Sequence, residues 1–120
     1  MAARKKARFG AKDLHGIIAP MTTPFTRKGE VDEAAFRKQV QFLIKAGVHG
    51  LAVGGSTGEG HTLSGAEATR LVRIAMVEAR GRVPVVAGII VDSTRQAIER
   101  AEAVADLGPA ALQITPVHYL

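Results

Sequence analysis

Four short apolar runs alternate with three amphipathic stretches along the chain. The apolar runs are Ile17–Met21, Leu51–Val53, Val83–Ile90 and Ala110–Thr115. None of them alternates cleanly between apolar and polar residues, as expected for strands buried on both faces of a parallel sheet. Successive runs start about 30 residues apart, which is the length of one strand–helix unit. The pattern therefore predicts the element order β-α-β-α-β-α-β.

Each amphipathic stretch has residues that start and end a helix. The predicted start and end residues are Asp32 and Gly47, Ser64 and Gly81, and Ser93 and Gly108. Asp32 is a good N-cap, and Val31 and Phe36 occupy the positions of a hydrophobic staple around it. Glu67 and Gln96 each follow a serine by three residues, which is the spacing of a capping box. Three helices are therefore predicted.

Two α/β architectures fit this order of elements. One is part of a (β/α)8 barrel, and the other is a small open sheet with helices on both faces. In both architectures ligands bind where strands end and helices begin. The loops after Met21, Val53, Ile90 and Thr115 are therefore expected to form the functional face.

The net charge of +5 comes from the first residues of the chain. Five of the 16 lysine and arginine residues lie within residues 1–12, which contain no acidic residue, and the remaining 11 are balanced by 11 acidic residues. We predict a disordered basic tail over residues 1–12 and one domain over residues 13–120. Because the body has no basic face and few aromatic residues, nucleic-acid binding is not expected.

The residue types exclude several other classes of protein. The chain has no cysteine, which removes disulfides, thiolate metal sites and a cysteine nucleophile. No two of the four histidines have the spacing of metal ligands, so no metal and no cofactor is expected. The run from Ile17 to Ala19 is too short for the apolar part of a signal peptide, and no run approaches a membrane span. A cytoplasmic protein is expected.

A glycine-rich loop follows the second predicted strand. Its sequence, Gly-Gly-Ser-Thr-Gly-Glu-Gly-His-Thr, covers residues 54–62. The spacing of Gly55 and Gly60 resembles that of a P-loop, but His61 stands where the motif has lysine and the helix starts later. Backbone N–H groups and the hydroxyls of Ser56 and Thr57 suit a small carboxylate. The alternative is that both hydroxyls only cap local turns.

Several motifs, in the right order, resemble the dihydrodipicolinate synthase/N-acetylneuraminate lyase family. The glycine loop followed by Thr62-Leu63-Ser64 resembles the family's signature. Thr23-Pro24-Phe25 resembles its first-strand motif, Pro84–Gly88 its third strand, and Thr115-Pro116 its fourth. The resemblance covers the chain from about His15 to its end.

The resemblance implies a fold, an activity and a set of site residues. It implies the α/β class and a (β/α)8 TIM barrel, of which the chain would carry four strands and three helices as a half-barrel, in a homo-oligomer. Family members join a lysine to pyruvate or a related 2-oxo acid as a Schiff base, and then make or break a carbon–carbon bond. Ser56 and Thr57, with the backbone of Gly55, would bind the carboxylate, and Thr57 would also relay protons. The family's tyrosine slot holds His118 here, with Tyr119 one step later, and either could serve as the relay.

The resemblance also implies a nucleophile that the chain does not supply. The family's Schiff-base lysine lies on the sixth strand, and the six lysines here are Lys5, Lys6, Lys12, Lys28, Lys38 and Lys45. Only Lys28 falls in a loop on the expected functional face, in a polar turn beside Arg27. We therefore expect the chain to be inactive alone. The alternatives are a non-catalytic module for 2-oxo-acid binding or assembly, and a nucleotide-binding open sheet.

Overall fold

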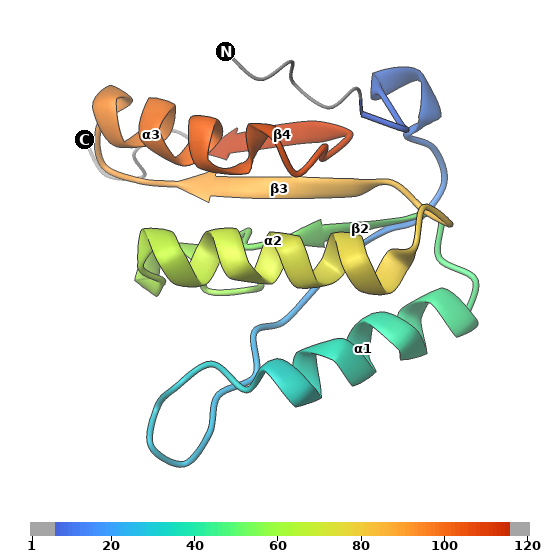
Figure 1. The fold of residues 1–120 in the computed structure, drawn as a ribbon, viewed down its shortest axis with the longest axis horizontal. Coiled ribbons are helices and arrows are strands. Elements are labelled where there is room, and N and C mark those ends of the chain that lie inside the picture. The colour runs from blue at the N-terminus through green and yellow to red at the C-terminus, as the bar shows by residue number, and fades with distance from the viewer. Residues whose placement is uncertain (1–6, 116–120) are drawn as a thin grey trace.

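The computed structural model describes residues 7–115, which form one four-stranded parallel sheet covered by three helices (Figure 1). The strands are β1 (Ile18–Pro20), β2 (Gly50–Val53), β3 (Val85–Ile90) and β4 (Ala111–Thr115). The helices are α1 (Glu33–Lys45), α2 (Gly65–Ala79) and α3 (Thr94–Ala105), with short 3-10 turns η1 (Ala11–Asp13) and η2 (Gly60–Thr62). The predicted order of elements is confirmed.

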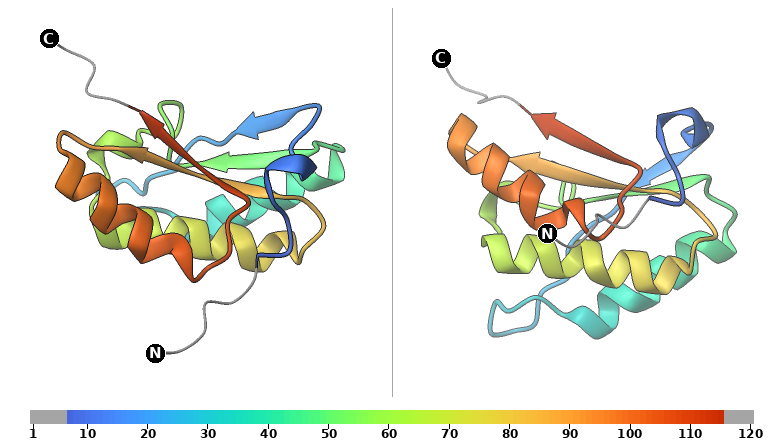
Figure 2. Two further views of the ribbon diagram at one scale, coloured as in Figure 1. Left: turned by 90° about the horizontal axis from the view of Figure 1, so that it is seen from above. Right: turned by 45° about the horizontal axis from the view of Figure 1, so that its top comes forward.

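The sheet has the strand order β1-β2-β3-β4, and all three pairs are parallel. The three helices lie on the same face of the sheet, as the two views of Figure 2 show. An open doubly wound sheet would carry helices on both faces and reverse its strand order at one point. The barrel-type architecture is therefore confirmed over the open sheet. The nucleotide-binding role named as an alternative stays a prediction.

The core lies between the sheet and the helices. Its most buried side chains come from α1, α2 and the helix-facing side of β2 and β3, and they include Phe36, Val40, Leu51, Val53, Leu71, Ala75 and Val85. Val31 packs against this cluster together with the first turn of α1, in keeping with the predicted staple. Burial of these apolar surfaces is the main force that holds the helical layer on the sheet.

The helix starts agree with the predicted caps, with one correction. The Asp32 carboxylate accepts from the Ala35 N–H at 2.9 Å. Ser64 and Glu67 form a reciprocal capping box, with bonds of 3.1 and 2.8 Å. Ser93 accepts from Gln96, but the Gln96 side chain accepts from the N–H of Asp92. The predicted second box is therefore only half formed, because the Gln96 side chain reaches one residue further back.

Both outer strands of the sheet have only one neighbour among the described residues, β1 pairing with β2 and β4 with β3. Beside β4, three large apolar side chains are exposed: Leu112 and Ile114 on the strand and Ile98 on α3. In a closed barrel another strand–helix unit would cover such positions. None of the described helices is both long and apolar enough to cross a membrane.

Residues 1–6 of the predicted tail lie outside the described residues. From Gly10 the chain makes the turn η1, in which the Gly10 N–H donates to the Asp13 carboxylate at 2.8 Å. The division into a tail and a domain stays a prediction.

Candidate functional site

A small depression lies at the rim of the sheet where the strands end. It has a volume of about 140 Å³. Its lining residues come from the ends of β1, β2 and β4 and from the glycine loop, and they are Pro20, Met21, Ala52, Gly55, Ser56, Thr57, Gly58, Gln113 and Thr115. None of these side chains carries a charge. The depression therefore brings the predicted Gly55, Ser56 and Thr57 together at the expected face.

The glycine loop is wound tightly enough to make its own hydrogen bonds. The Gly60 N–H donates to the Gly55 carbonyl at 3.0 Å, and the Glu59 N–H donates to the Ser56 carbonyl at 3.1 Å. Gly54 enters the loop with φ at 73°, and Glu59 takes the left-handed conformation with φ at 55°. A left-handed residue other than glycine is uncommon and persists where surrounding contacts hold it.

Two glycines let the loop touch the strands on either side. A Cβ added to Gly58 would lie 2.9 Å from the Met21 carbonyl oxygen at the end of β1. A Cβ added to Gly88 of β3 would lie 2.6 Å from backbone atoms of Gly54 and Gly55. Both distances are shorter than ordinary van der Waals contact, so backbone rests directly on backbone at both points. The close approach of the loop to the strands therefore requires glycine at both positions.

The hydrogen-bonding groups of Ser56 and Thr57 are available to a ligand. Both residues are exposed, and the loop's side-chain hydrogen bonds are made instead by Thr23 to Gly58 and by Thr62 to Glu59. Within residues 7–115, neither the Ser56 nor the Thr57 N–H donates to a backbone carbonyl. The alternative was that the two hydroxyls only cap local turns. Within residues 7–115 neither hydroxyl makes the hydrogen bond to backbone that such capping requires.

Two polar lining residues were not predicted as site residues from the sequence. Gln113 and Thr115 extend from β4 into the depression beside the loop. Gln113 pairs in register with Gly88, and its side-chain oxygen lies 3.8 Å from the position of a Cβ on Gly55. The available signal was a polar residue inside the otherwise apolar run Ala110–Thr115. Its significance depends on strand register, which the sequence pattern does not give.

Within the described part of the chain, the remaining candidate residues are not among those that line the depression. His118 and Tyr119, the predicted relay residues, lie outside the described residues. Of the lysines that the structure describes, none lines the depression. Asp92 lines a neighbouring depression with His61, Gln96 and Arg100. Within residues 7–115 no group of three or more histidine, aspartate or glutamate side chains is placed to hold a metal ion.

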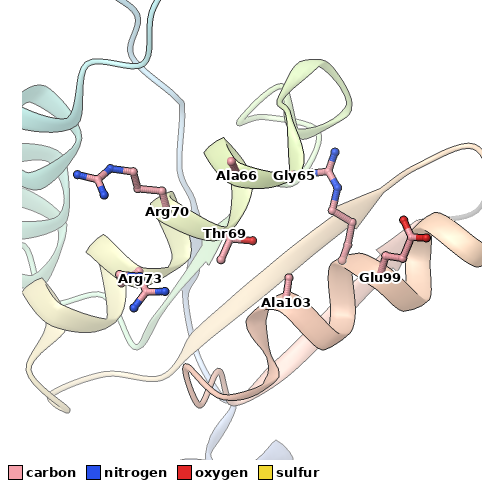
Figure 3. Close-up of a pocket in the computed structure, with 8 residues that line it drawn as sticks. Gly65, Ala66, Thr69, Arg70, Arg73, Glu99 and Ala103 are labelled. Atoms are coloured by element: carbon pink, nitrogen blue, oxygen red, sulfur yellow. The ribbon is translucent and has the colours of Figure 1, made fainter.

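A larger groove of about 540 Å³ lies on the outer side of the molecule, between α2 and α3 (Figure 3). Two of its three arginines make hydrogen bonds that hold the helical layer together. Arg70 points toward α1, where it pairs with Glu33, and Arg100 donates to the carbonyls of Leu63 and Ser64. The residues that line the groove all come from the two helices, and none comes from the strand ends, where α/β barrels hold their chemistry. We therefore assign the candidate site to the smaller depression.

The shifted pKa values also belong to the helical layer. The Arg70 hydrogen bond lowers the pKa of Glu33, and Glu33 in turn raises the pKa of Arg70. Hydrogen bonds from Gln41 and then Arg37 lower the pKa of Glu78. These groups join α1 to α2 at the surface, so the shifts report helix packing and not catalysis.

The comparison with known families decides the assignment of the chain. The model of the dihydrodipicolinate synthetase family matches residues 13–120. The chain belongs to this family. The resemblance read from the glycine loop and the strand motifs is therefore confirmed.

Curated relatives in the family are 4-hydroxy-tetrahydrodipicolinate synthases. The one from Methylobacterium radiotolerans is 45% identical over 106 residues, which are 88% of this chain and 35% of the relative. The one from Methanothermobacter thermautotrophicus is 42% identical, over 88% of this chain and 38% of the relative. The chain thus spans about a third of the length of the curated relatives it matches.

Solved structures of family members have the same fold over the matched region. Dihydrodipicolinate synthase from Bacillus clausii superposes with a TM-score of 0.84 at 34% identity, over 92% of this chain and 38% of that one. A prophage protein of the family from E. coli K12, solved in complex with pyruvate, gives a TM-score of 0.80 at 33% identity, over 87% and 35%. The fold prediction is confirmed at this level.

Proposed function

We propose that the depression at the glycine loop binds the carboxylate of pyruvate or a related 2-oxo acid, as part of a Schiff-base-forming lyase or aldolase. The observation that carries this proposal is the pair of exposed residues Ser56 and Thr57, whose hydroxyl and N–H groups have no partner among the described residues. Four such donors suit the two oxygens of a carboxylate. The E. coli relative solved with pyruvate supports the choice of ligand.

The size and charge of the depression agree with a small acid. Its volume of about 140 Å³ is several times the roughly 10–15 Å³ that one water molecule needs on the same measure, which leaves room for an acid of three carbons. Because the lining side chains are uncharged, neutral donors alone would hold the carboxylate. Such binding is weaker than an arginine–carboxylate pair. We therefore expect a dissociation constant in the millimolar range for pyruvate.

We further propose that the 120 residues bind the acid without forming the Schiff base. None of the described lysines lines the depression, and a Schiff-base lysine must reach the keto carbon and have a lowered pKa. This observation favours the non-catalytic binding role for the chain by itself. The Thr57 hydroxyl, with His118 or Tyr119, stays the proposed proton relay for a site completed by a lysine.

A titration followed by NMR tests the binding proposal. Pyruvate should shift the amide resonances of Gly55, Ser56 and Thr57, and the combined variant Ser56→Ala, Thr57→Val should lose these shifts. Pyruvamide keeps the shape of pyruvate but lacks its charge, and it should leave the resonances unchanged. The proposal is wrong if pyruvamide acts as pyruvate does, or if tens of millimolar pyruvate has no effect.

Borohydride reduction in the presence of pyruvate tests the absence of the Schiff base. Mass spectrometry should show the unmodified mass of the chain. A stoichiometric adduct that maps to Lys28 would overturn this part of the proposal.

Self-association is also proposed for the chain. One similar solved structure is described as the first monomeric variant of dihydrodipicolinate synthase, which marks association as the usual state of such enzymes. The outer edges of β1 and β4, which have no partner strand within residues 7–115, provide a physical reason for it here. The cytoplasmic location expected from the sequence stays a prediction.

A further inference from the structure

Thr23, three residues beyond the end of β1 at Pro20, is the buried polar residue of the described chain. Its relative exposure is 6%, and it is the sole polar or charged residue among the buried residues within 7–115. Its hydroxyl donates to the carbonyl oxygen of Gly58 at 2.7 Å, across 35 residues of sequence. Buried hydroxyls are normally hydrogen-bonded. The partner of this one is a carbonyl of the glycine loop.

The bond from Thr23 acts on a peptide unit that is held at both ends. The Gly58 carbonyl and the Glu59 N–H belong to one planar peptide group. Thr23 holds the carbonyl, and the Ser56 carbonyl accepts from the Glu59 N–H at 3.1 Å. Because the group is planar, fixing the direction of the Gly58 carbonyl also fixes the direction of the Glu59 N–H, and with it the backbone of Ser56.

In the described structure, no other side-chain hydrogen bond joins the loop to a neighbouring segment. The second side-chain bond, from Thr62 to Glu59, lies at the loop's own end. Gly58 is buried against the Met21 carbonyl, so the loop and the end of β1 are in direct contact at this point. Glu59 holds its left-handed conformation immediately beyond the bond. A residue in that conformation persists only where surrounding contacts determine it.

We infer that Thr23 is a positioning residue for the carboxylate-binding loop: it fixes the Gly58–Glu59 peptide and so sets the places of Ser56 and Thr57. This inference rests on the proposed function and adds to it a residue that does not line the depression. Thr23 does not touch the ligand. Loss of its hydroxyl should weaken pyruvate binding through the loop alone.

The test compares Thr23→Val, which keeps the shape and removes the hydroxyl, with Thr23→Ser, which keeps the hydroxyl. Thr26→Val is the matched control, because Thr26 also uses its hydroxyl on nearby backbone, in an exposed turn that does not reach the loop. Two quantities are measured in each variant. They are the hydrogen-exchange rate of the Glu59 amide relative to that of Leu51 in the core, and the dissociation constant of pyruvate.

Thr23→Val should raise the relative exchange rate of Glu59 and the dissociation constant of pyruvate each roughly tenfold, as expected when a buried carbonyl loses its partner. Thr23→Ser and Thr26→Val should stay within about twofold of the parent on the same scale. Equal acceleration of Glu59 and Leu51 would indicate a general loss of stability and would overturn the inference. An unchanged Glu59 rate in Thr23→Val would overturn it as well.

Two further outcomes keep this inference separate from the proposed function. If the parent binds no pyruvate while Thr23→Val still accelerates Glu59, the ligand proposal fails and the anchoring of the loop by Thr23 stands. If Thr23→Val does not fold, the anchoring is tested by a measurement on the parent chain. Its Thr23 hydroxyl proton should be protected from exchange with water, and a rapidly exchanging hydroxyl would refute the anchoring.

Discussion

Replacing Gly88 by alanine tests the close contact between β3 and the glycine loop. An added Cβ would lie 2.6 Å from the carbonyl carbon and oxygen of Gly54 and from the nitrogen of Gly55. Ordinary contact begins at about 3.4 Å, so the loop or the strand must move by roughly 0.8 Å, and the atoms that must move are backbone. Overpacking of this kind costs about 1–3 kcal/mol.

A second effect of the same change has the opposite sign. Gly88 lies in a strand without a positive φ, so alanine fits its backbone conformation and stabilises by about 0.4–1 kcal/mol through the unfolded chain. The net expectation is a loss of about 1–2 kcal/mol. If the free energy of unfolding falls by about 2 kcal/mol per molar urea, the unfolding midpoint should fall by roughly 0.5–1 M.

Urea unfolding followed by circular dichroism measures this change, and amide spectra of residues 54–60 report where the loop moves. Gly10→Ala is the matched control, because an added Cβ there meets nothing within 4 Å. The control has the same effect on the unfolded chain without the steric clash, so its midpoint should be equal to or slightly above that of the parent, with the parent loop spectrum. A Gly88→Ala variant with an unchanged midpoint and an unchanged loop spectrum would refute the steric reasoning.

Three further outcomes follow from the helical layer and the sheet edges. Ser64→Ala removes a reciprocal capping box and should lower stability by about 1–2 kcal/mol, whereas Ser93→Ala removes a single cap bond and should cost about half as much; thermal unfolding that ranks them in reverse would contradict this. The pKa of Glu78 is lowered from 4.5, so its charged form stabilises the fold above that pH, and this contribution is lost as the pH falls through the lower pKa of the folded state. The Glu78→Gln variant should therefore lose less stability than the parent between pH 5 and pH 3. Equal losses of stability in the two proteins would exclude the effect. Because the edge strands β1 and β4 contain no charged residue, sedimentation of the 120-residue chain at micromolar concentration should show dimers or larger species, and a stable monomer would disprove the reasoning.

The sequence pattern was informative wherever a local signal determined the structure. Asp32 and Ser64 were predicted as caps because capping uses groups within three or four residues of each other. The strand positions followed from short apolar runs, although β1 is shorter than the run Ile17–Met21 that predicted it. The glycine loop was recognisable because its residues are contiguous in the chain.

Contacts between distant residues could not be predicted in the same way. Gln113 reaches the depression because it is in register with Gly88, and Thr23 meets Gly58 because a loop crosses the end of β1. Each of these pairs depends on the register of parallel strands and on backbone distances, which apolar patterning leaves undetermined. The proposed relay at His118 and Tyr119 lies outside the described residues and stays a prediction.

The strands lie in the sheet in the same order as in the chain. This order affects how the protein can fold during its synthesis. Each strand pairs with the strand synthesised just before it, and one helix lies between the two in the chain. Each new strand pair therefore closes a loop of about 30 residues, and the entropy cost of each closure is modest for a parallel sheet. A nascent chain can add one strand–helix unit at a time as it leaves the ribosome. Within residues 7–115, the segment at Ala7 and Arg8, which lies beside Gly108 and Gly81, must wait for the later units to form.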